Sequence, residues 1–239
     1  MNRKIQLFCI PYAGGMADSF RELAGLISQS EEILPILLEY AGHGTRKTES
    51  FYGNFDEMTE DIARQIREKR IPECDFALLG YSMGSIVTYE ILAKDLLGEA
   101  PCHVFVAAHE APDVHWECKV YEQMQDEEFM ERMISFGGFP NFDWKLMKNK
   151  FFRRLYFQPI REDYRLLSIY RMKKQIVLPA PATVIYSPQD IPTEQIRSWD
   201  KFAAGEMEYV ELGRNHFFLK EHAEDLAKIL RERLEKECL

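Results

Sequence analysis

Short apolar runs alternate with amphipathic segments along most of the chain. Five mostly apolar runs predict buried strands, and they are residues 4–10, 33–39, 76–79, 103–108 and 181–187. Residues 207–212, which include two glutamates, predict the last strand. Segments with helical periodicity separate or follow these runs, and they are residues 19–27, 55–70, 86–97, 193–202 and 221–234. Strands that are apolar throughout are typical of a parallel sheet covered on both faces. The alternation therefore predicts an α/β fold with a mostly parallel central sheet and helices on both faces.

The alternation of strands and helices stops between about residues 109 and 176. This segment predicts helices at residues 126–136, 144–157 and 163–170, and it contains no strong strand. Its large aromatic residues are Phe136, Phe139, Phe142, Trp144, Phe151, Phe152, Tyr156 and Phe157. Some must pack on the core, since so many exposed rings would cause aggregation, and the others could line a pocket. We expect a helical lid inserted between two core strands, although periodicity does not separate the two groups of rings.

One strand runs directly into the sequence Gly80-Tyr81-Ser82-Met83-Gly84, and a helix follows at once. A Gly-x-Ser-x-Gly sequence between a strand and a helix is typical of a nucleophilic serine at a sharp turn. Glycine fits on both sides of the serine because larger residues would crowd the turn. The amides at the start of the helix also favour negative charge beside Ser82. A chance match in a loop is the alternative, and the flanking strand and helix favour the nucleophile.

A base and an acid follow two later strands. Asp190 comes just after the run at 181–187, and His216 lies between the run at 207–212 and the last helix. The carboxyl ends of parallel strands share one edge of a sheet, so both side chains should lie on the same edge as Ser82. The chain order of serine, acid and histidine is that of α/β-hydrolases. The sequence therefore predicts a catalytic triad of Ser82, Asp190 and His216.

Other acids and histidines are weaker candidates. Glu194 and Asp200 fall inside a predicted helix rather than at a strand end. His43 precedes the nucleophile in a turn-rich loop, whereas this fold places its base near the C-terminus. His222 lies inside the last predicted helix, so we expect it at the surface. We interpret His43 as structural.

A glycine-rich loop, Pro11-Tyr12-Ala13-Gly14-Gly15, follows the first strand. Such a loop between a strand and a helix leaves backbone N–H groups free, and in α/β-hydrolases it supplies one of two oxyanion donors. The alternative is a simple turn. The loop's pairing with the serine turn favours the oxyanion role.

Composition and charge narrow the class of protein. The length of 239 residues suits one domain, residues 1–239, and the net charge of −9 argues against nucleic acid as a partner. No apolar run is long enough for a signal-peptide core or a membrane span. The odd number of cysteines and the lack of a C-x-x-C pair argue against a disulfide framework or a zinc site; these residues are Cys9, Cys74, Cys102, Cys118 and Cys238. We expect a cytoplasmic monomer.

Charge is uneven along the chain. Residues 144–174 contain ten lysines and arginines against two acids, which gives a net charge of +8 in an acidic protein. A basic patch of this kind would suit docking of an acidic partner, with Lys150, Arg153 and Arg154 as candidate contacts. The alternative is a solvated surface without a partner.

The motifs together resemble those of type II thioesterases, the free-standing editing enzymes of non-ribosomal peptide and polyketide synthetases in the α/β-hydrolase superfamily. The resemblance is carried by residues 8–15, by the serine turn at 80–85, by Pro159-Ile160-Arg161 with Asp163-Tyr164, and by Gly213 to Leu219 around His216. The opening and histidine signatures together are specific to this family. One departure is Tyr81, because the family commonly has histidine before the nucleophile.

The resemblance implies hydrolysis of stalled or misprimed acyl groups from the phosphopantetheine arm of acyl or peptidyl carrier proteins. It implies an acyl-Ser82 intermediate and an oxyanion hole formed by the backbone N–H groups of Ala13 and Met83. No metal or bound cofactor is required, and the basic lid would suit acidic carrier domains. Two alternatives are a general short-chain esterase and a non-catalytic binding module of the same fold. The intact Ser82, Asp190 and His216 disfavour the second.

Overall fold

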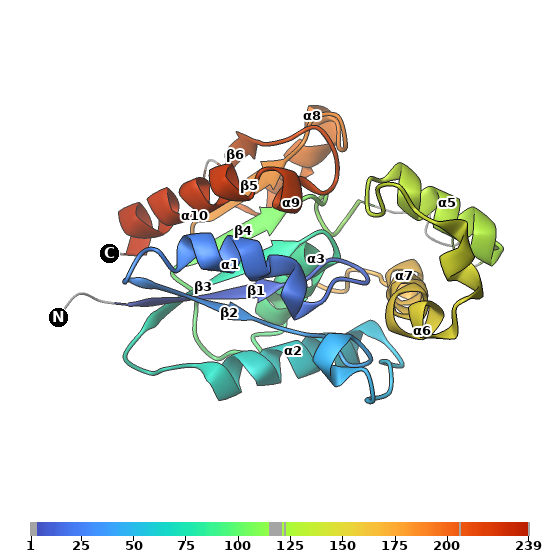
Figure 1. Cartoon of the computed structure of the whole chain (residues 1–239). Coiled ribbons are helices and arrows are strands. Elements are labelled where there is room, and N and C mark those ends of the chain that lie inside the picture. Colours follow the sequence, from blue (N-terminus) through green and yellow to red (C-terminus); the bar gives the residue numbers. More distant parts are fainter. Residues whose placement is uncertain (1–3, 115–120, 122, 206, 239) are drawn as a thin grey trace.

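A parallel sheet of six strands forms the centre of the protein (Figure 1). The computed structural model describes residues 4–114, 121, 123–205 and 207–238. Within them the strands pair in the order β2-β1-β3-β4-β5-β6, and every pair is parallel. The strands are β1 (Ile5–Ile10), β2 (Ile33–Leu37), β3 (Asp75–Tyr81), β4 (His103–Ala107), β5 (Ala182–Tyr186) and β6 (Glu208–Glu211). The predicted fold class is confirmed.

Helices cover both faces of the sheet. Along β1, Leu7 and Cys9 pack on one face, whereas Phe8 and Ile10 pack on the other, and all four are buried. This burial on both faces explains why the strands are apolar throughout. One face carries α1 (Arg21–Ile27), α9 (Phe218–Glu221) and α10 (Ala223–Cys238), and the other carries α2 (Phe55–Lys69), α3 (Met83–Ala93), α8 (Thr193–Ile196) and η5 (Arg197–Phe202). In the part of the chain that the structure describes, no helix is long and apolar enough to cross a membrane.

The segment between β4 and β5, residues 109–176, is called the lid segment below. Its helices gather at one end of the molecule, away from both chain ends (Figure 1). They are α5 (Asp126–Ser135), η3 (Trp144–Lys148), α6 (Lys150–Phe152), η4 (Arg153–Phe157) and α7 (Gln158–Ile169). The helix predicted at 144–157 is broken once, at Asn149, whose side chain caps α6 through the amides of Phe151 and Phe152. After this break α6, η4 and α7 follow one another without a non-helical residue.

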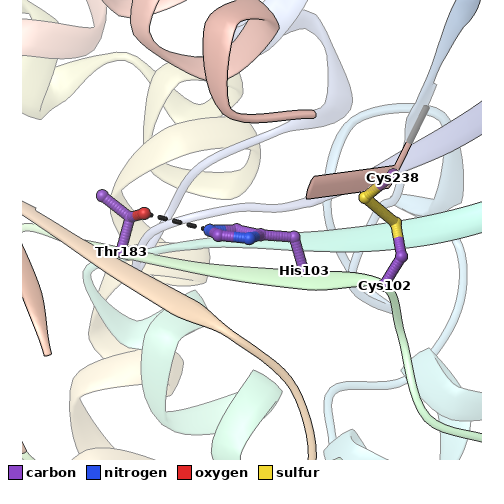
Figure 2. Close-up of a disulfide and its surroundings, with 4 residues drawn as sticks. All are labelled: Cys102, His103, Thr183 and Cys238. Atoms are coloured by element: carbon purple, nitrogen blue, oxygen red, sulfur yellow. Dashed lines mark hydrogen bonds between the residues drawn. A yellow bond between two sulfur atoms is a disulfide. The ribbon is translucent and has the colours of Figure 1, made fainter. Parts of the chain in front are cut away.

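A disulfide joins Cys102, just before β4, to Cys238 in the last turn of α10 (Figure 2). The expectation that the cysteines form no disulfide is therefore wrong. The two residues are 136 positions apart in the sequence. Their Cα atoms are only 5.8 Å apart, because β4 begins at the edge of the sheet where α10 ends. Cys9 is a free, buried thiol, and burial raises its pKa to about 12. Cys118 lies outside the described residues.

His103 lies in β4 beside this disulfide (Figure 2). It is 2% exposed, and its Nε2 atom is 3.0 Å from Oγ1 of Thr183. The Thr183 hydroxyl donates to Glu208 at 3.1 Å, so it accepts from His103, which places the imidazole proton on Nε2. The Nδ1 atom has no partner among the described residues. Burial lowers the pKa of His103 to about 4.

We predict that this histidine makes the fold sensitive to acid. The unfolded chain takes up the proton near pH 6.5, whereas the folded chain takes it up only near pH 4, so the unfolded state binds more protons between these values. The free energy of unfolding should fall by about 3 kcal/mol as the pH is lowered through this window. His103→Gln should remove that part of the pH dependence in urea denaturation measured at several pH values.

His222→Gln serves as the matched control, because His222 is only half-buried and lies outside the sheet. The pH dependence of this variant is the reference against which the effect of His103→Gln is compared. The comparison uses the slope of the free energy of unfolding against pH, which can be compared between variants that differ in absolute stability. An unchanged slope in His103→Gln would show that His103 is not the acid-sensitive group.

Candidate active site

Ser82 occupies a strained turn between β3 and α3. Its backbone angles are φ 52° and ψ −118°, a conformation that side chains other than glycine rarely adopt. A Cβ atom on Gly80 would lie 2.4 Å from the carbonyl oxygen of Gly84, and one on Gly84 would lie 2.2 Å from the carbonyl oxygen of Ile10. Only glycine fits at both positions. Because Gly80 and Gly84 have no side chains, the backbone packs closely on both sides of Ser82. This packing holds Ser82 at the edge of the sheet.

Three side chains that the sequence predicts at one edge of the sheet form a hydrogen-bonded line. The Nε2 atom of His216 is 2.9 Å from Oγ of Ser82, and its Nδ1 atom is 2.7 Å from Oδ2 of Asp190. Each follows a different strand: Ser82 follows β3, Asp190 follows β5 and His216 follows β6. A neutral imidazole with its proton on Nδ1 would donate to Asp190 and accept from Ser82. Asp200 instead accepts from the hydroxyl of Tyr209 at 2.8 Å.

Tyr81 holds the loop that contains His216, called the histidine loop below, and this role was not predicted from the sequence. Its hydroxyl donates to the carbonyl oxygen of His216 at 2.7 Å and accepts from the Leu219 amide at 3.2 Å. The side chain is fully buried, and burial raises the pKa of Tyr81 well above its usual value, so it remains a donor. The one sequence signal for this role of Tyr81 was its departure from the histidine that the family usually has at this position.

Two backbone amides beside Ser82 are free to donate. In the described part of the chain, no group accepts a hydrogen bond from the amides of Ala13 and Met83. The neighbouring amides of the glycine-rich loop are occupied: Gly14 donates to Asp163 at 2.6 Å, and Gly15 donates to the Tyr12 carbonyl at 2.7 Å. Ala13 lines the same cavity as Ser82, and Met83 begins α3. The two predicted oxyanion donors thus have no competing acceptor.

A cavity of about 670 Å³ opens over Ser82 and His216, beneath the lid segment. The lid contributes an apolar wall that includes Met133, Phe136, Phe139, Tyr156 and Ile160. The structure therefore shows which lid aromatics reach the cavity, and two of them, Phe136 and Phe139, also pack against the lid's own core. Phe129 and Phe157 pack within the lid's own core, whereas Phe151 is 78% exposed. Charged residues line another part of the cavity: Asp18, Arg21, Glu22 and Lys220.

The three candidate docking cations differ in their surroundings. Arg153 forms an ion pair with Asp126, and its guanidinium lies 4.9 Å from the centre of the Phe157 ring. Lys150 and Arg154 are exposed and pair with no carboxylate in the described residues. Arg153 therefore holds the lid together, and the other two remain available at its surface.

Comparison with known proteins gives one family match over nearly the whole chain. A family model described as a thioesterase domain matches residues 5–234. The gramicidin S biosynthesis protein GrsT of Aneurinibacillus migulanus is 26% identical over 236 residues, which are 97% of this chain and 89% of GrsT.

Solved structures resemble the chain over the same extent. ClbQ from the colibactin NRPS/PKS pathway superimposes with a TM-score of 0.86 at 25% identity and covers 98% of both chains. The RedJ thioesterase from the prodiginine biosynthetic pathway in Streptomyces coelicolor has a TM-score of 0.82 and 28% identity, over 96% of this chain and 86% of RedJ.

Removing the Tyr81 hydroxyl should loosen the histidine loop. We expect Tyr81→Phe to lower kcat for a small acyl thioester by about 10-fold, because misplaced reacting groups lose rate, with little change in KM. Tyr89→Phe is the matched control, since the Tyr89 hydroxyl also donates to one backbone carbonyl and accepts from one backbone amide, at Lys174 and Ile176. Equal kcat values for the two variants would contradict the assigned role.

Proposed function

The chain belongs to the thioesterase family, and from that premise we propose that it clears stalled or misprimed acyl groups from carrier proteins of a non-ribosomal peptide or polyketide synthetase. Its family makes it a hydrolase that acts on thioesters. GrsT belongs to gramicidin S biosynthesis and ClbQ to an NRPS/PKS pathway, which supports this class of pathway. The observation that carries the proposal is the line of Ser82, His216 and Asp190 at the base of a cavity under the lid.

The first half of the reaction forms an acyl-enzyme. His216 takes the proton from Ser82 as Oγ attacks the thioester carbonyl carbon, and Asp190 stabilises the resulting imidazolium. The carbonyl oxygen becomes an oxyanion that the amides of Ala13 and Met83 bind. Loss of one such donor typically costs about 3–4 kcal/mol of transition-state stabilisation.

Collapse of this intermediate completes the acyl-enzyme, and hydrolysis then releases the acid. The carbon–sulfur bond breaks, and His216 gives its proton to the departing sulfur, whose thiol has a pKa near ~8.5 and leaves readily. A water molecule then attacks the acyl carbonyl while His216 accepts its proton. The bond to Ser82 breaks, and the serine recovers a proton from His216. We propose no step that needs a metal or a cofactor.

The cavity suits an acyl chain attached to a polar arm. The apolar wall under the lid would bind the acyl chain, because burial of its methylene groups is favourable. The charged part of the cavity carries both signs, and Arg21 is paired there with Asp18. Lys220 is the cation that suits the phosphate-bearing arm of a carrier protein. A volume of about 670 Å³ lies within the usual range for small-ligand pockets.

The lid surface beside this cavity combines exposed cations with exposed rings. This docking face consists of Trp144, Lys145, Lys148, Lys150, Phe151 and Arg154. Tyr156, in the same stretch of chain, lines the cavity that contains Ser82, so this stretch of the lid reaches the site. Exposed cations would steer an acidic carrier domain, and the rings would anchor it.

Replacement of the nucleophile tests the mechanism directly. Ser82→Ala should lower kcat for an acyl-phosphopantetheinyl carrier protein by at least about 1000-fold, because no acyl-enzyme can form. Thermal unfolding should show a folded protein, since alanine is smaller than serine. Turnover close to that of the wild type would refute the proposed mechanism.

Charge reversal of the docking face tests the partner. The double variant Lys150→Glu and Arg154→Glu should raise KM for the acyl carrier protein by about 3- to 10-fold, because two favourable charge contacts become unfavourable. KM for the matching acyl-pantetheine thioester should not change. The double variant Lys228→Glu and Lys236→Glu, on α10, makes the same change in net charge away from the lid and should leave both values unchanged.

The wild-type enzyme provides the comparison with a general esterase. The proposal expects a higher kcat/KM for the acyl carrier protein than for the acyl-pantetheine thioester. Equal values would favour a general short-chain esterase. An unchanged KM for the acyl carrier protein in the variant Lys150→Glu and Arg154→Glu would refute only the docking face and not the thioesterase mechanism.

A further inference from the structure

Helix α7 of the lid touches the glycine-rich loop through two residues one turn apart. Ile160 lies so close that a Cβ atom on Gly14 would be 2.1 Å from its Cγ1 atom. Asp163 accepts a hydrogen bond from the Gly14 amide at 2.6 Å. Gly14 has a φ of +74°, which glycine adopts without strain. The loop next to Ser82 is therefore shaped around the lid helix.

Asp163 is also paired with His43, and both side chains are buried. Asp163 is 1% exposed and His43 is fully buried, with Nε2 of His43 3.0 Å from the same Oδ2 atom that binds Gly14. The Nδ1 atom of His43 is 3.0 Å from the Ala41 carbonyl oxygen. Both ring nitrogens face acceptors, and both can donate only when the ring is protonated. Burial lowers the pKa of His43, but the charge and hydrogen bond of Asp163 more than offset this, so the pKa is raised overall.

These contacts decide which amide of the loop remains free. The Gly14 amide is held by Asp163, and the Gly15 amide is held by the Tyr12 carbonyl. On the other side of the loop, the Tyr40 hydroxyl donates to the Pro11 carbonyl at 2.8 Å. Asp163 thereby orients the peptide group after Ala13 from outside the loop, and Gly15 holds the peptide group before Ala13 from within it. Of the three consecutive amides of Ala13, Gly14 and Gly15, only that of Ala13 is left to meet an oxyanion at Ser82.

We infer that Asp163, supported by His43, is a positioning residue that orients the glycine-rich loop so that the Ala13 amide can bind the oxyanion. This inference rests on the proposed function. It makes the completed oxyanion hole depend on the position of α7, because an outward movement of the helix would remove the acceptor from the Gly14 amide. It would also separate the buried charges of Asp163 and His43, which opposes such movement.

Arg165 allows this role to be distinguished from simple anchoring of the lid. It lies on the same helix and donates to the Tyr52 carbonyl at 2.7 Å, so it fastens α7 to the body without touching the glycine-rich loop. Asp163→Ala removes the acceptor for Gly14, whereas Asp163→Asn keeps an oxygen that can accept. Arg165→Met removes an anchor of the lid and leaves the loop contacts intact.

The test compares these variants on two readouts. One is hydrolysis of an acyl-pantetheine thioester, and the other is inhibition by a trifluoromethyl ketone with the same acyl chain. Oγ of Ser82 adds to the ketone carbon, its proton passes to His216, and the carbonyl oxygen becomes an oxyanion, so the inhibition constant reports on the oxyanion hole. The acyl-pantetheine substrate keeps carrier docking out of the comparison.

Asp163→Ala should lower kcat by about 10- to 100-fold with KM within about twofold, and it should weaken the ketone by a similar factor. Asp163→Asn should recover most of both losses. Arg165→Met should lower the melting temperature but leave kcat and the inhibition constant within about twofold of the wild type. If Asp163→Ala matches Arg165→Met on both readouts, or loses rate without weakening the ketone, the inference is wrong.

Amide NMR of the wild type tests the inference even where Asp163→Ala does not fold. The Gly14 amide proton should be shifted downfield and protected from solvent exchange in the free enzyme. The Ala13 amide should become protected only when the ketone binds. Protection of Gly14 rather than Ala13 on binding would overturn the assignment.

The same experiments separate failure of the inference from failure of the proposed function. A wild-type enzyme that hydrolyses no thioester would refute the function. An active wild type whose kcat and ketone affinity do not depend on Asp163 would refute only the positioning role.

Discussion

The active site depends on one close contact between backbones. Gly84, at the start of α3, packs against the carbonyl oxygens of Ile10 and Pro11 so closely that no side chain fits between them. This contact brings the N-terminus of α3 against the end of β1, and the glycine-rich loop follows directly. The nucleophile at Ser82 and the amide at Ala13 are therefore neighbours because two pieces of backbone meet without side chains. The strained turn at Ser82 is stabilised by packing on both sides rather than by its own conformation.

The sheet and the triad could be predicted because each of their signals is local. An apolar run marks each strand, and the chemically special residue follows within a few positions of its end, as with Asp190 and His216. Parallel strands end at a common edge, so local order in the sequence becomes proximity in space. Elements held by distant partners could not be predicted in this way. Cys102 and Cys238 are brought together only by the folding of β4 against α10, and Tyr81 contacts the His216 carbonyl across 135 positions of sequence.

The lid shows a second limit of sequence reasoning, because composition counts charges but not their partners. The net charge of +8 over residues 144–174 includes several cations that the fold uses internally. Arg161 binds the carbonyls of Tyr121 and Met124, and Lys173 pairs with Asp56. The available surface is consequently smaller than the sequence indicates. It is concentrated in residues 144–154, which comprise η3 and the beginning of the helical stretch after Asn149.

The two parts of the catalytic centre are held by different parts of the protein. Ser82, Asp190 and His216 follow strands of one sheet, so their spacing is set by the most buried part of the fold. The glycine-rich loop is instead fixed from outside by the lid residue Asp163. A sheet-based triad can therefore persist while the lid changes position, whereas the oxyanion donors are complete only with α7 in place. In the proposed mechanism, α7 contributes both to the cavity wall, through Ile160, and to the oxyanion hole, through Asp163, so choice of thioester and stabilisation of the transition state would depend on the same helix.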